Sequence, residues 1–358
     1  MPPLSMLIKP VSGHCDLRCR YCFYQEKSGG PMSLETLETI VRKALAFADG
    51  SCAFLFQGGE PTLAGQPFYE ALIACQKRYN TKRVAISNSI QTNGMRIDQK
   101  WAEFLAEHDF LVGLSLDGPE APHDQTRCGS FGRAMQAASL LRQAGARFNI
   151  LCVVSRANAA QGKQVYRFFK ENGFRHLQFI PCLDPMDVRR GSLPWSLTPK
   201  SYLAFLKTTF DLWHRDCMDG SAPSIRYFDN LLGMVMGRPP EACGMSGVCG
   251  CQFVTEADGS VYPCDFYVSD ERNIGNILDH GFEDMRFSSA CERFIEDSLR
   301  LHQDCRHCQW LSFCRGGCRR DREPPGGKNA GKNYFCETYR AFFAYALPRL
   351  RQLAENNE

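Results

Sequence analysis

The sequence predicts an α/β fold in which an incomplete parallel (β/α) barrel of six strands precedes a smaller cysteine-rich domain. In residues 4–183, short apolar β-prone runs alternate with stretches whose apolar residues recur at every third or fourth position, the pattern of strands alternating with helices. Near Cys243 the composition changes, because glycine and cysteine become dense and long apolar runs disappear until residue 334. We therefore expect residues 1–235 to form the barrel with a linker and a helix, and residues 236–358 to form the second domain with a C-terminal helix.

The predicted strands and helices alternate, as parallel βαβ units require. The strands are Ser5–Lys9, Cys52–Gln57, Val84–Gln91, Phe110–Ser115, Phe148–Val154 and His176–Pro181. The helices between them are Leu34–Ala48, Pro67–Tyr79, Lys100–Glu107, Arg133–Ala144 and Gly162–Asn172. A charged stretch rich in Pro and Gly at residues 184–199 predicts a linker, and an amphipathic helix follows at Leu203–Trp213. Since a parallel barrel carries its chemistry at the carboxyl ends of its strands, the residues after each strand are candidates for a site.

Cysteine is the unusual feature of the composition. The 358 residues include 19 cysteines, and the formal net charge of +3 is too small to favour binding to nucleic acid or to a membrane. The first residues lack the basic start and apolar core of a signal peptide, and no apolar run is long enough to span a bilayer. We therefore expect a protein of the reducing cytoplasm whose cysteines are metal ligands, catalytic groups or core residues rather than disulfides. Cysteines and an aspartate interrupt the basic residues from Arg315 to Arg322, which favours a shell around an anionic cluster.

Three cysteines follow the first predicted strand at the spacing Cys15-x-x-x-Cys19-x-x-Cys22, and the aromatic Tyr21 precedes the third. Three thiolates within eight residues can hold one small metal centre, but they leave a tetrahedral or cubic centre one ligand short. An open position is typical of a catalytic metal site, because structural sites close all of theirs. A zinc loop and three core cysteines are the alternatives that this spacing alone leaves open.

Glycines and polar residues end the next three predicted strands. Gly58-Gly59-Glu60 follows the second strand, Gln91-Thr92-Asn93-Gly94 ends the third, and Ser115-Leu116-Asp117-Gly118 ends the fourth. Glycines let the backbone approach a bound group closely, and the polar groups could meet a charged ligand or a ribose. Ordinary turns explain each of these segments equally well.

A second group of cysteines occupies the C-terminal part of the chain. Cys243 and Cys249 come first, and Cys249 and Cys264 flank a predicted hairpin that turns at Asp258-Gly259. The others are Cys305-x-x-Cys308-x5-Cys314-x-x-x-Cys318 and, finally, Cys336. A Cys-x-x-Cys pair lets two thiolates bind one metal from a single turn, and the short spacers keep further ligands within reach. Structural zinc sites are the alternative to iron–sulfur clusters here.

Taken together, the motifs resemble those of the radical S-adenosylmethionine (SAM) enzymes with a C-terminal SPASM domain. The resemblance implies that Cys15, Cys19 and Cys22 hold a [4Fe–4S] cluster whose fourth iron binds SAM. It implies two auxiliary [4Fe–4S] clusters, the first held by Cys243, Cys249, Cys264 and Cys318 and the second by Cys305, Cys308, Cys314 and Cys336. It also implies SAM contacts at Tyr21, Gly58, Gly59, Glu60, Ser115, Arg127 and Leu183. The other eight cysteines are then small core or surface thiols, with Cys251 the least certain because it lies two residues from a proposed ligand.

The chain resembles more narrowly the anaerobic sulfatase-maturating enzymes, over nearly its full length. The segments that carry this resemblance are residues 1–10, residues 56–65, Gln91-Thr92-Asn93-Gly94, Cys251-Gln252-Phe253-Val254 and Asp258 to Tyr267. That family oxidises a Cys or Ser within a Cys/Ser-x-Pro/Ala-x-Arg sequence of a nascent sulfatase to Cα-formylglycine, after a 5′-deoxyadenosyl radical removes a Cβ hydrogen. The resemblance implies that Asp265 is the base, and an anionic cluster beside it should disfavour its ionisation and make it a better base than a free aspartate.

The same resemblance implies partners and leaves alternatives. The expected partners are an unfolded or nascent sulfatase and a reductant such as flavodoxin or ferredoxin, and nothing demands more than a monomer. Another SPASM peptide maturase, which forms thioether or carbon–carbon crosslinks or epimerises residues, is the nearest alternative. Such enzymes often carry a peptide-recognition domain before the barrel, for which Cys15 lies too near the N-terminus. A non-catalytic zinc scaffold that presents a peptide-binding surface is the alternative from a different class.

Overall fold

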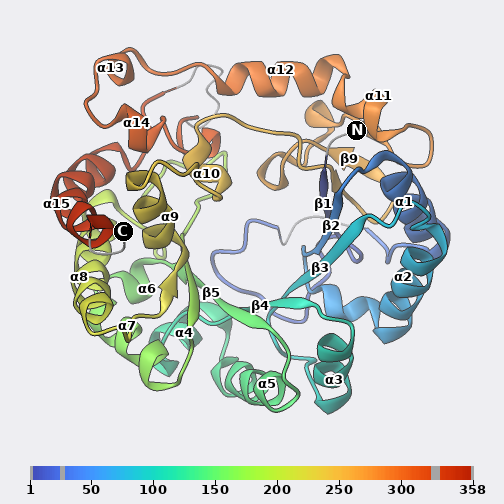
Figure 1. Cartoon of the computed structure of the whole chain (residues 1–358), viewed down its shortest axis with the longest axis horizontal. Coiled ribbons are helices and arrows are strands. Elements are labelled where there is room, and N and C mark those ends of the chain that lie inside the picture. The colour runs from blue at the N-terminus through green and yellow to red at the C-terminus, as the bar shows by residue number, and fades with distance from the viewer. Residues whose placement is uncertain (1–2, 25–28, 324–330, 356–358) are drawn as a thin grey trace.

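The computed structural model describes residues 3–24, 29–323 and 331–355. Its strands are β1 (Leu4–Ile8), β2 (Ser51–Phe56), β3 (Ala85–Thr92), β4 (Leu111–Ser115), β5 (Phe148–Val154), β6 (His176–Pro181), β7 (Ser224–Ile225), β8 (Val254–Thr255), β9 (Ser260–Tyr262) and β10 (Gly275–Asn276). They form one sheet in the order β10-β9-β8-β1-β2-β3-β4-β5-β6-β7. Strands β1 to β7 are parallel to their neighbours, and the sheet curls into an open barrel with helices around its outside (Figure 1).

Helices connect the parallel strands and cover the barrel. They are α1 (Leu34–Phe47), α2 (Gln66–Tyr79), α3 (Gln99–Glu107), α4 (Glu120–Arg127), α5 (Phe131–Gln143), α6 (Arg156–Ala159), α7 (Gly162–Glu171), α8 (Pro199–Met218) and α9 (Arg226–Val235). The C-terminal part contributes α10 (Cys243–Ser246), α11 (Phe282–Arg286), α12 (Ser289–Ser298), α13 (Gln303–Arg306), α14 (Leu311–Cys314) and α15 (Cys336–Glu355). Short 3-10 turns cover Pro61–Ala64, Asp265–Tyr267, Asp270–Arg272 and Arg319–Asp321. None of the described helices has the length and apolar character needed to cross a bilayer.

The predicted partial barrel with its smaller cysteine-rich domain is confirmed. Two predicted strands coincide with β5 and β6, and the other four differ from the observed strands by one residue at one end or both. The predicted hairpin at Asp258-Gly259 is present, with β8 and β9 antiparallel. Helix α4 and the strands β7 and β10 were not predicted, because two to eight residues are too few to show a clear period. The predicted domain boundary after residue 235 remains a prediction.

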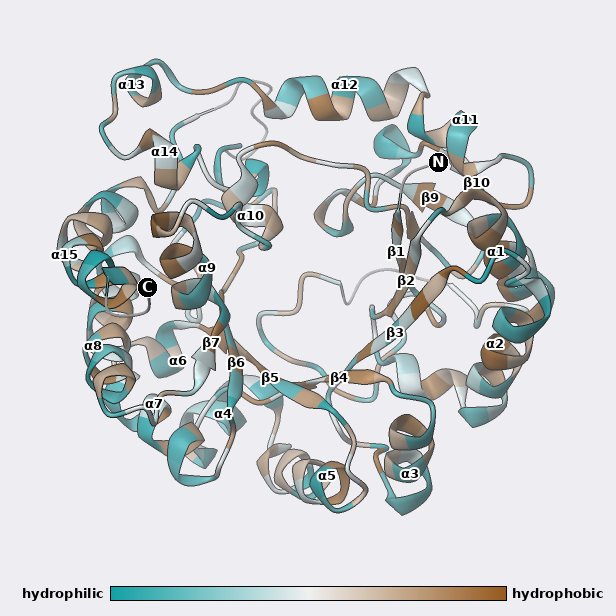
Figure 2. Ribbon diagram, viewed as in Figure 1, coloured by the Kyte–Doolittle hydropathy of each residue, from teal (hydrophilic) through white to brown (hydrophobic). Residues whose placement is uncertain are grey.

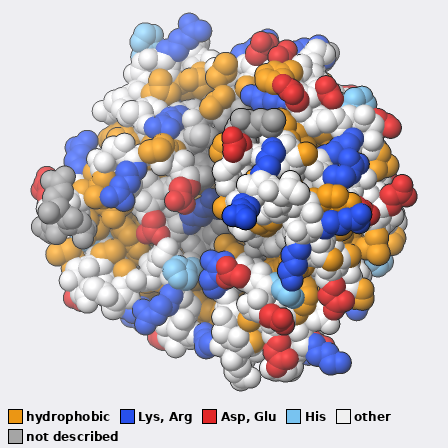
Figure 3. Space-filling view, turned by 45° about the vertical axis from the view of Figure 1, so that its right-hand side comes forward, with side chains coloured by type: hydrophobic (Ala, Val, Ile, Leu, Met, Phe, Trp, Pro, Cys, Tyr) orange, Lys and Arg blue, Asp and Glu red, His pale blue; other side chains and the backbone are white. Residues whose placement is uncertain are grey.

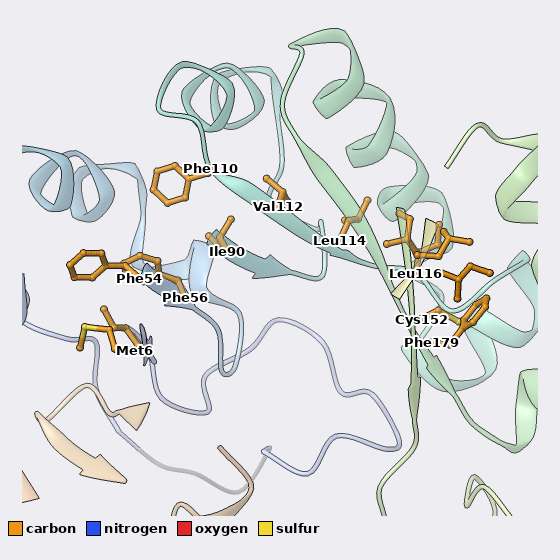
Figure 4. Packing of buried hydrophobic residues seen from close by; sticks show 14 of the residues in the cluster. Met6, Phe54, Phe56, Ile90, Phe110, Val112, Leu114, Leu116, Cys152 and Phe179 are labelled. Carbon is orange, nitrogen blue, oxygen red and sulfur yellow. The ribbon is translucent and has the colours of Figure 1, made fainter. Parts of the chain in front are cut away.

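The core of the barrel lies between the sheet and its helices. Every second residue of β2, namely Cys52, Phe54 and Phe56, is fully buried, as are Ile90 of β3 and Val112 of β4. These side chains belong to one cluster that continues to Leu116 and Phe179 (Figure 4). Each large apolar side chain in it contributes about 1.5–3 kcal/mol of burial energy. In Figure 2 the strands are mostly brown, and the surrounding helices carry teal on their outer sides, as amphipathic helices should.

The C-terminal part extends the barrel sheet rather than standing apart from it. Strand β1 pairs in parallel with β8 through Leu7–Val254 and Ile8–Thr255, on the edge opposite β2. The antiparallel strands β9 and β10 follow. Near this junction, the Lys43 ammonium of α1 donates to the carbonyls of residues 277, 278 and 280 at 2.7, 3.1 and 2.9 Å. The first strand of the chain is therefore an inner strand of the sheet, which joins the two parts.

The Lys43 contacts predict local stability at this junction. Replacing the ammonium in Lys43→Met leaves three carbonyls without their charged donor, which should cost about 1–2 kcal/mol locally. Hydrogen exchange of the amides in residues 277–280 should then be about 5–30-fold faster by mass spectrometry. Arg42→Met, an exposed neighbour on the same helix, is the matched control and should leave that exchange unchanged. Equal protection in both variants would show that the ammonium does not hold the junction.

Candidate active site

The three N-terminal cysteines lie in the loop after β1, at the carboxyl edge of the barrel strands. Cys22 N donates to the Cys19 carbonyl at 3.1 Å, which turns the loop back on itself. The Cys15 sulfur accepts from Leu17 N at 3.4 Å and from Asn93 Nδ2 at 3.7 Å. Burial raises the pKa of Cys15 and that of Cys19, the latter to about 11, and the charges of the neighbouring thiolates raise both further. These thiols therefore need a bound cation to be thiolates at neutral pH, which fits a metal centre.

The Gly58-Gly59-Glu60 turn after β2 lies directly against this loop. Glu60 N donates to the His14 carbonyl at 2.8 Å, one residue before Cys15. Gly59 has φ +47°, and a Cβ at this position would lie 2.1 Å from the same carbonyl oxygen. Only glycine allows this approach, because a side chain would push the cysteine loop away.

The Glu60 side chain forms hydrogen bonds with other residues of the barrel edge. Its buried carboxylate accepts from Thr62 N and Oγ1 at 3.1 and 2.7 Å, from Thr92 Oγ1 at 2.8 Å and from Asn93 N at 2.7 Å. Burial raises the pKa of Glu60, and these hydrogen bonds oppose that rise. Glu60 thus ties the ends of β2 and β3 together beside Cys15. Its assignment as a SAM-binding residue remains a prediction, and the geometry supports a positioning role.

A second polar group forms around Asp117 at the end of β4. Its Oδ2 accepts from the Tyr21 hydroxyl at 2.5 Å and from Arg127 Nε at 2.9 Å, and its Oδ1 accepts from Val153 N at 2.9 Å. The Arg127 guanidinium lies 5.4 Å from the centre of the Tyr21 ring, and its Nη1 lies 3.9 Å from the Cys19 sulfur. Burial acts to lower the pKa of Arg127, but the charge of Asp117 raises it well above its ordinary value.

Tyr21 and Arg127 were predicted as site residues from the sequence, but Asp117, whose carboxylate joins them, was not. Asp117 was noted only as a polar strand end, and Arg127 lies on the unpredicted helix α4. Ser115 is buried at the end of β4, two residues before Asp117. Leu183 lies two residues beyond β6, outside this hydrogen-bonded group. The SAM-binding roles of all four residues remain predictions.

The C-terminal cysteines divide into two groups of four. In the first group, burial and then the charges of other members of the group raise the pKa of Cys249, Cys264 and Cys318. In the second group, burial and then the charges of Cys336, Cys305 and Cys308 raise the pKa of Cys314, and burial and the charge of Cys305 raise that of Cys336. The assignment of these two sets as cluster ligands remains a prediction. Among the described residues, no three His, Cys, Asp or Glu side chains stand close enough together to hold one metal ion.

The remaining cysteines are mostly core residues. Cys52, Cys152 and Cys182 are buried in the barrel. Cys251, the uncertain case, hydrogen-bonds the buried Cys291, and this contact raises the pKa of Cys251 and lowers that of Cys291 to about 7. Cys251 therefore pairs with a thiol outside both groups of four.

Asp265 lies at the meeting point of the two parts of the chain. It starts a 3-10 turn immediately after Cys264, and its side chain is 12% exposed. Its Oδ1 lies 2.5 Å from Lys9 Nζ, and its Oδ2 accepts from Gln57 Nε2 at 2.5 Å. Lys9 and Gln57 directly follow β1 and β2, so a carboxylate from the C-terminal part reaches the same barrel edge as the cysteine loop. The space-filling view shows a hollow near the middle of one face, with acidic and basic side chains around it (Figure 3).

Lys9, which pairs with Asp265, was not predicted as a site residue from the sequence. Its side chain is 1% exposed, and its ammonium lies 3.4 Å from the centre of the Tyr24 ring. The Tyr24 hydroxyl in turn hydrogen-bonds Glu256, whose pKa burial raises and Lys9 lowers. A lysine that ends a buried strand was the available signal, since buried ammonium groups need paired anions. The ion pair holds the Asp265 side chain in place at the end of β1.

Comparisons with known proteins agree with this geometry. Residues 10–169 match the family model of the radical SAM superfamily, and residues 247–309 match an iron–sulfur cluster-binding domain, SPASM. The chain is 47% identical to a cysteine-type anaerobic sulfatase-maturating enzyme of Clostridium perfringens, covering 99% of this chain and 100% of that one. It is 32% identical to a serine-type enzyme of Bacteroides thetaiotaomicron, covering 97% and 90%. A solved structure described as native anSMEcpe with bound AdoMet and Cp18Cys peptide superposes with a TM-score of 0.97 at 47% identity, covering both chains fully.

The contact between Gly59 and the cysteine loop predicts the effect of one added methyl group. Gly59→Ala would place that methyl group against the His14 carbonyl, and relief of the clash should cost about 1–3 kcal/mol. We expect a lower melting temperature and a lower iron content of protein purified without oxygen. Gly132→Ala on α5, where a Cβ meets nothing within 4 Å, should lower neither measurement, because alanine is the better helix former. An unchanged iron content in Gly59→Ala would contradict a close fit between this turn and the loop.

Proposed function

The chain belongs to the anaerobic sulfatase-maturating enzymes of the radical SAM superfamily, and on that basis we propose that its substrate is a cysteine. It is an oxidoreductase that converts a target residue of a sulfatase to Cα-formylglycine, with three [4Fe–4S] clusters and SAM as cofactors. Identity is 47% to cysteine-type relatives and 32% to a serine-type relative, which supports cysteine as the target. Crosslinking and epimerising maturases are not favoured.

The position of Asp265 is the observation that supports its role as the base in this oxidation. A carboxylate from the C-terminal part is held by Lys9 and Gln57 at the barrel edge that also carries the cysteine loop. When bound, the cofactors supply what side chains cannot, namely a 5′-deoxyadenosyl radical that removes a hydrogen atom from the target Cβ and an acceptor for the second electron. In our proposal Asp265 accepts the thiol proton of the target, while Lys9 fixes one carboxylate oxygen and Gln57 orients the other. Loss of the hydrogen atom, the proton and the second electron leaves a thioaldehyde, which water hydrolyses to the aldehyde with release of hydrogen sulfide.

We assign the cofactor ligands by the groups that the fold assembles. Cys15, Cys19 and Cys22 would hold the SAM-binding cluster. The first auxiliary cluster would be held by Cys243, Cys249, Cys264 and Cys318, and the second by Cys305, Cys308, Cys314 and Cys336. The SAM site would be lined by Tyr21, Gly58, Gly59, Ser115, Arg127 and Leu183. Glu60 would hold the ends of β2 and β3 in place beside this site. The buried polar group around Asp117 supports the placement of Tyr21 and Arg127 beside that cluster.

The proposal extends to the setting in which the enzyme works. The substrate would be an unfolded or nascent sulfatase, since the target residue must reach the barrel edge. A structural relative is described with a bound peptide, which supports a peptide substrate. A flavodoxin or ferredoxin would supply electrons to a monomeric enzyme in the cytoplasm, where reducing conditions keep the thiols available as ligands.

The test of the cysteine assignment is a comparison of two peptides. Anaerobic enzyme with SAM and a reductant is incubated with Cys-x-Pro-x-Arg and Ser-x-Pro-x-Arg peptides that are otherwise identical. We expect the aldehyde to form at least about tenfold faster from the cysteine peptide, because a thiol yields its proton to a carboxylate more easily than a hydroxyl does. Mass spectrometry measures the aldehyde. Equal or faster oxidation of the serine peptide would refute the assignment, and 5′-deoxyadenosine without any aldehyde would point to another maturase.

If Asp265 is the base, its replacement should strongly reduce peptide oxidation without affecting cluster content. Asp265→Asn keeps the size of the side chain but removes the base, so aldehyde formation should fall by about 10²–10⁴-fold while iron and sulfide content stay normal. Asp258→Asn, in the turn of the same hairpin, is the control and should keep normal activity. Near-normal turnover of Asp265→Asn would remove Asp265 as the base.

A further inference from the structure

Arg322 is a buried cation that forms no ion pair with a carboxylate of the described residues. It is 3% exposed and lies four residues after Cys318. Its Nη1 and Nη2 donate to the carbonyls of Arg300 and Ser298, both at 2.8 Å, and its Nε has no hydrogen-bond partner in the part of the chain that the structure describes. Within the described residues no carboxylate forms an ion pair with it, and the adjacent Asp321 pairs with Arg190 at 3.2 Å instead.

The charge of the neighbouring buried Arg319 is compensated by two carboxylates. Arg319 is 5% exposed, and its guanidinium pairs with Glu323 at 2.6 Å and with Asp297 at 3.6 Å. An unpaired buried charge is disfavoured by several kcal/mol, and two carbonyl dipoles compensate only part of this cost. Asp321 interacts with Arg322 at longer range, but Arg190 and Arg320 act on Asp321 more strongly, so the charge of Arg322 is only partly compensated and a further anion beside it would be favourable.

The contacts of Arg322 place it near both groups of C-terminal cysteines. Ser298 accepts from Arg322 through its carbonyl and from Cys249 N through its Oγ at 2.9 Å, so one residue holds both. The Arg322 side chain also packs against Gly316, where an added Cβ would lie 3.7 Å from its Cδ. Gly316 stands two residues from Cys314 of the second group and two from Cys318 of the first.

We propose that Arg322 is a positioning cation shared by the two auxiliary clusters, which neutralises part of their charge and raises both reduction potentials. This inference rests on the cluster assignment of the proposed function. Four thiolates give each cluster a net negative charge, and a fixed cation favours the reduced, more negative state. One residue between the two clusters would thereby shift both potentials in the same direction.

The test measures potentials rather than turnover. In protein with Cys15, Cys19 and Cys22 replaced by alanine, only the auxiliary clusters remain to be titrated by electron paramagnetic resonance. We expect Arg322→Gln to shift both auxiliary potentials to more negative values and Arg322→Lys to keep most of the original values. Arg319→Gln is the matched control, because Glu323 and Asp297 already compensate the charge of Arg319, and it should shift the two potentials less than Arg322→Gln does. Arg300→Gln, an exposed arginine, should shift neither.

The outcomes separate this inference from the proposed function. Unchanged potentials in Arg322→Gln with full iron and sulfide content would overturn the shared cation and leave the enzyme's function intact. Parent protein without iron–sulfur clusters would overturn the cluster assignment itself. If Arg322→Gln fails to assemble clusters, recovery of iron content in Arg322→Lys supports the role of the charge. Equal loss in both variants assigns Arg322 to packing and overturns the inference.

Discussion

The pairing of β1 with β8 is the constraint on which the site depends. Strand β1 carries β2 on one edge and β8 on the other, and Lys9 N donates to the Thr255 carbonyl at 2.9 Å just beyond the pair. This pairing sets where the β8–β9 hairpin ends, and therefore where Cys264 and Asp265 lie. Without it, the carboxylate of the C-terminal part would have no fixed position relative to the cysteine loop. A ladder of two residues is weak alone, but the Lys9–Asp265 ion pair and the Lys43 contacts fix the same junction.

Buried charges organise the site around this junction. Lys9 compensates Asp265 and Glu256, and Asp117 compensates Arg127, so most ionised groups at the barrel edge have partners within the chain. Such pairs add little net stability but hold side chains in one geometry, because a charge without its partner is strongly disfavoured. Arg322 departs from this pattern and lies among cysteines instead. The charges of the fold therefore indicate where bound anionic cofactors complete the structure.

The barrel strands and the cysteine groups could be predicted from the sequence, for different reasons. The strands show a period and differ little from the observed bounds, and cysteines bound in sets leave characteristic spacings. Asp265 was identified through family resemblance, since one aspartate after a cysteine carries no period or motif of its own. Lys9 and Asp117 were missed because their roles arise from contacts across the chain, Lys9 with Asp265 and Asp117 with Tyr21. Strand β8 was missed as an extension of the barrel sheet, because two residues show no alternation.

The most direct test of this account is an anaerobic crystal structure of the enzyme with SAM and a cysteine peptide. The decisive quantity is the distance from the target sulfur to the nearest Asp265 carboxylate oxygen. The account predicts about 2.6–3.2 Å or a single bridging water, with Lys9 still paired to the other oxygen. A target sulfur beyond the reach of Asp265, with the carboxylate still bound by both Lys9 and Gln57, would contradict it.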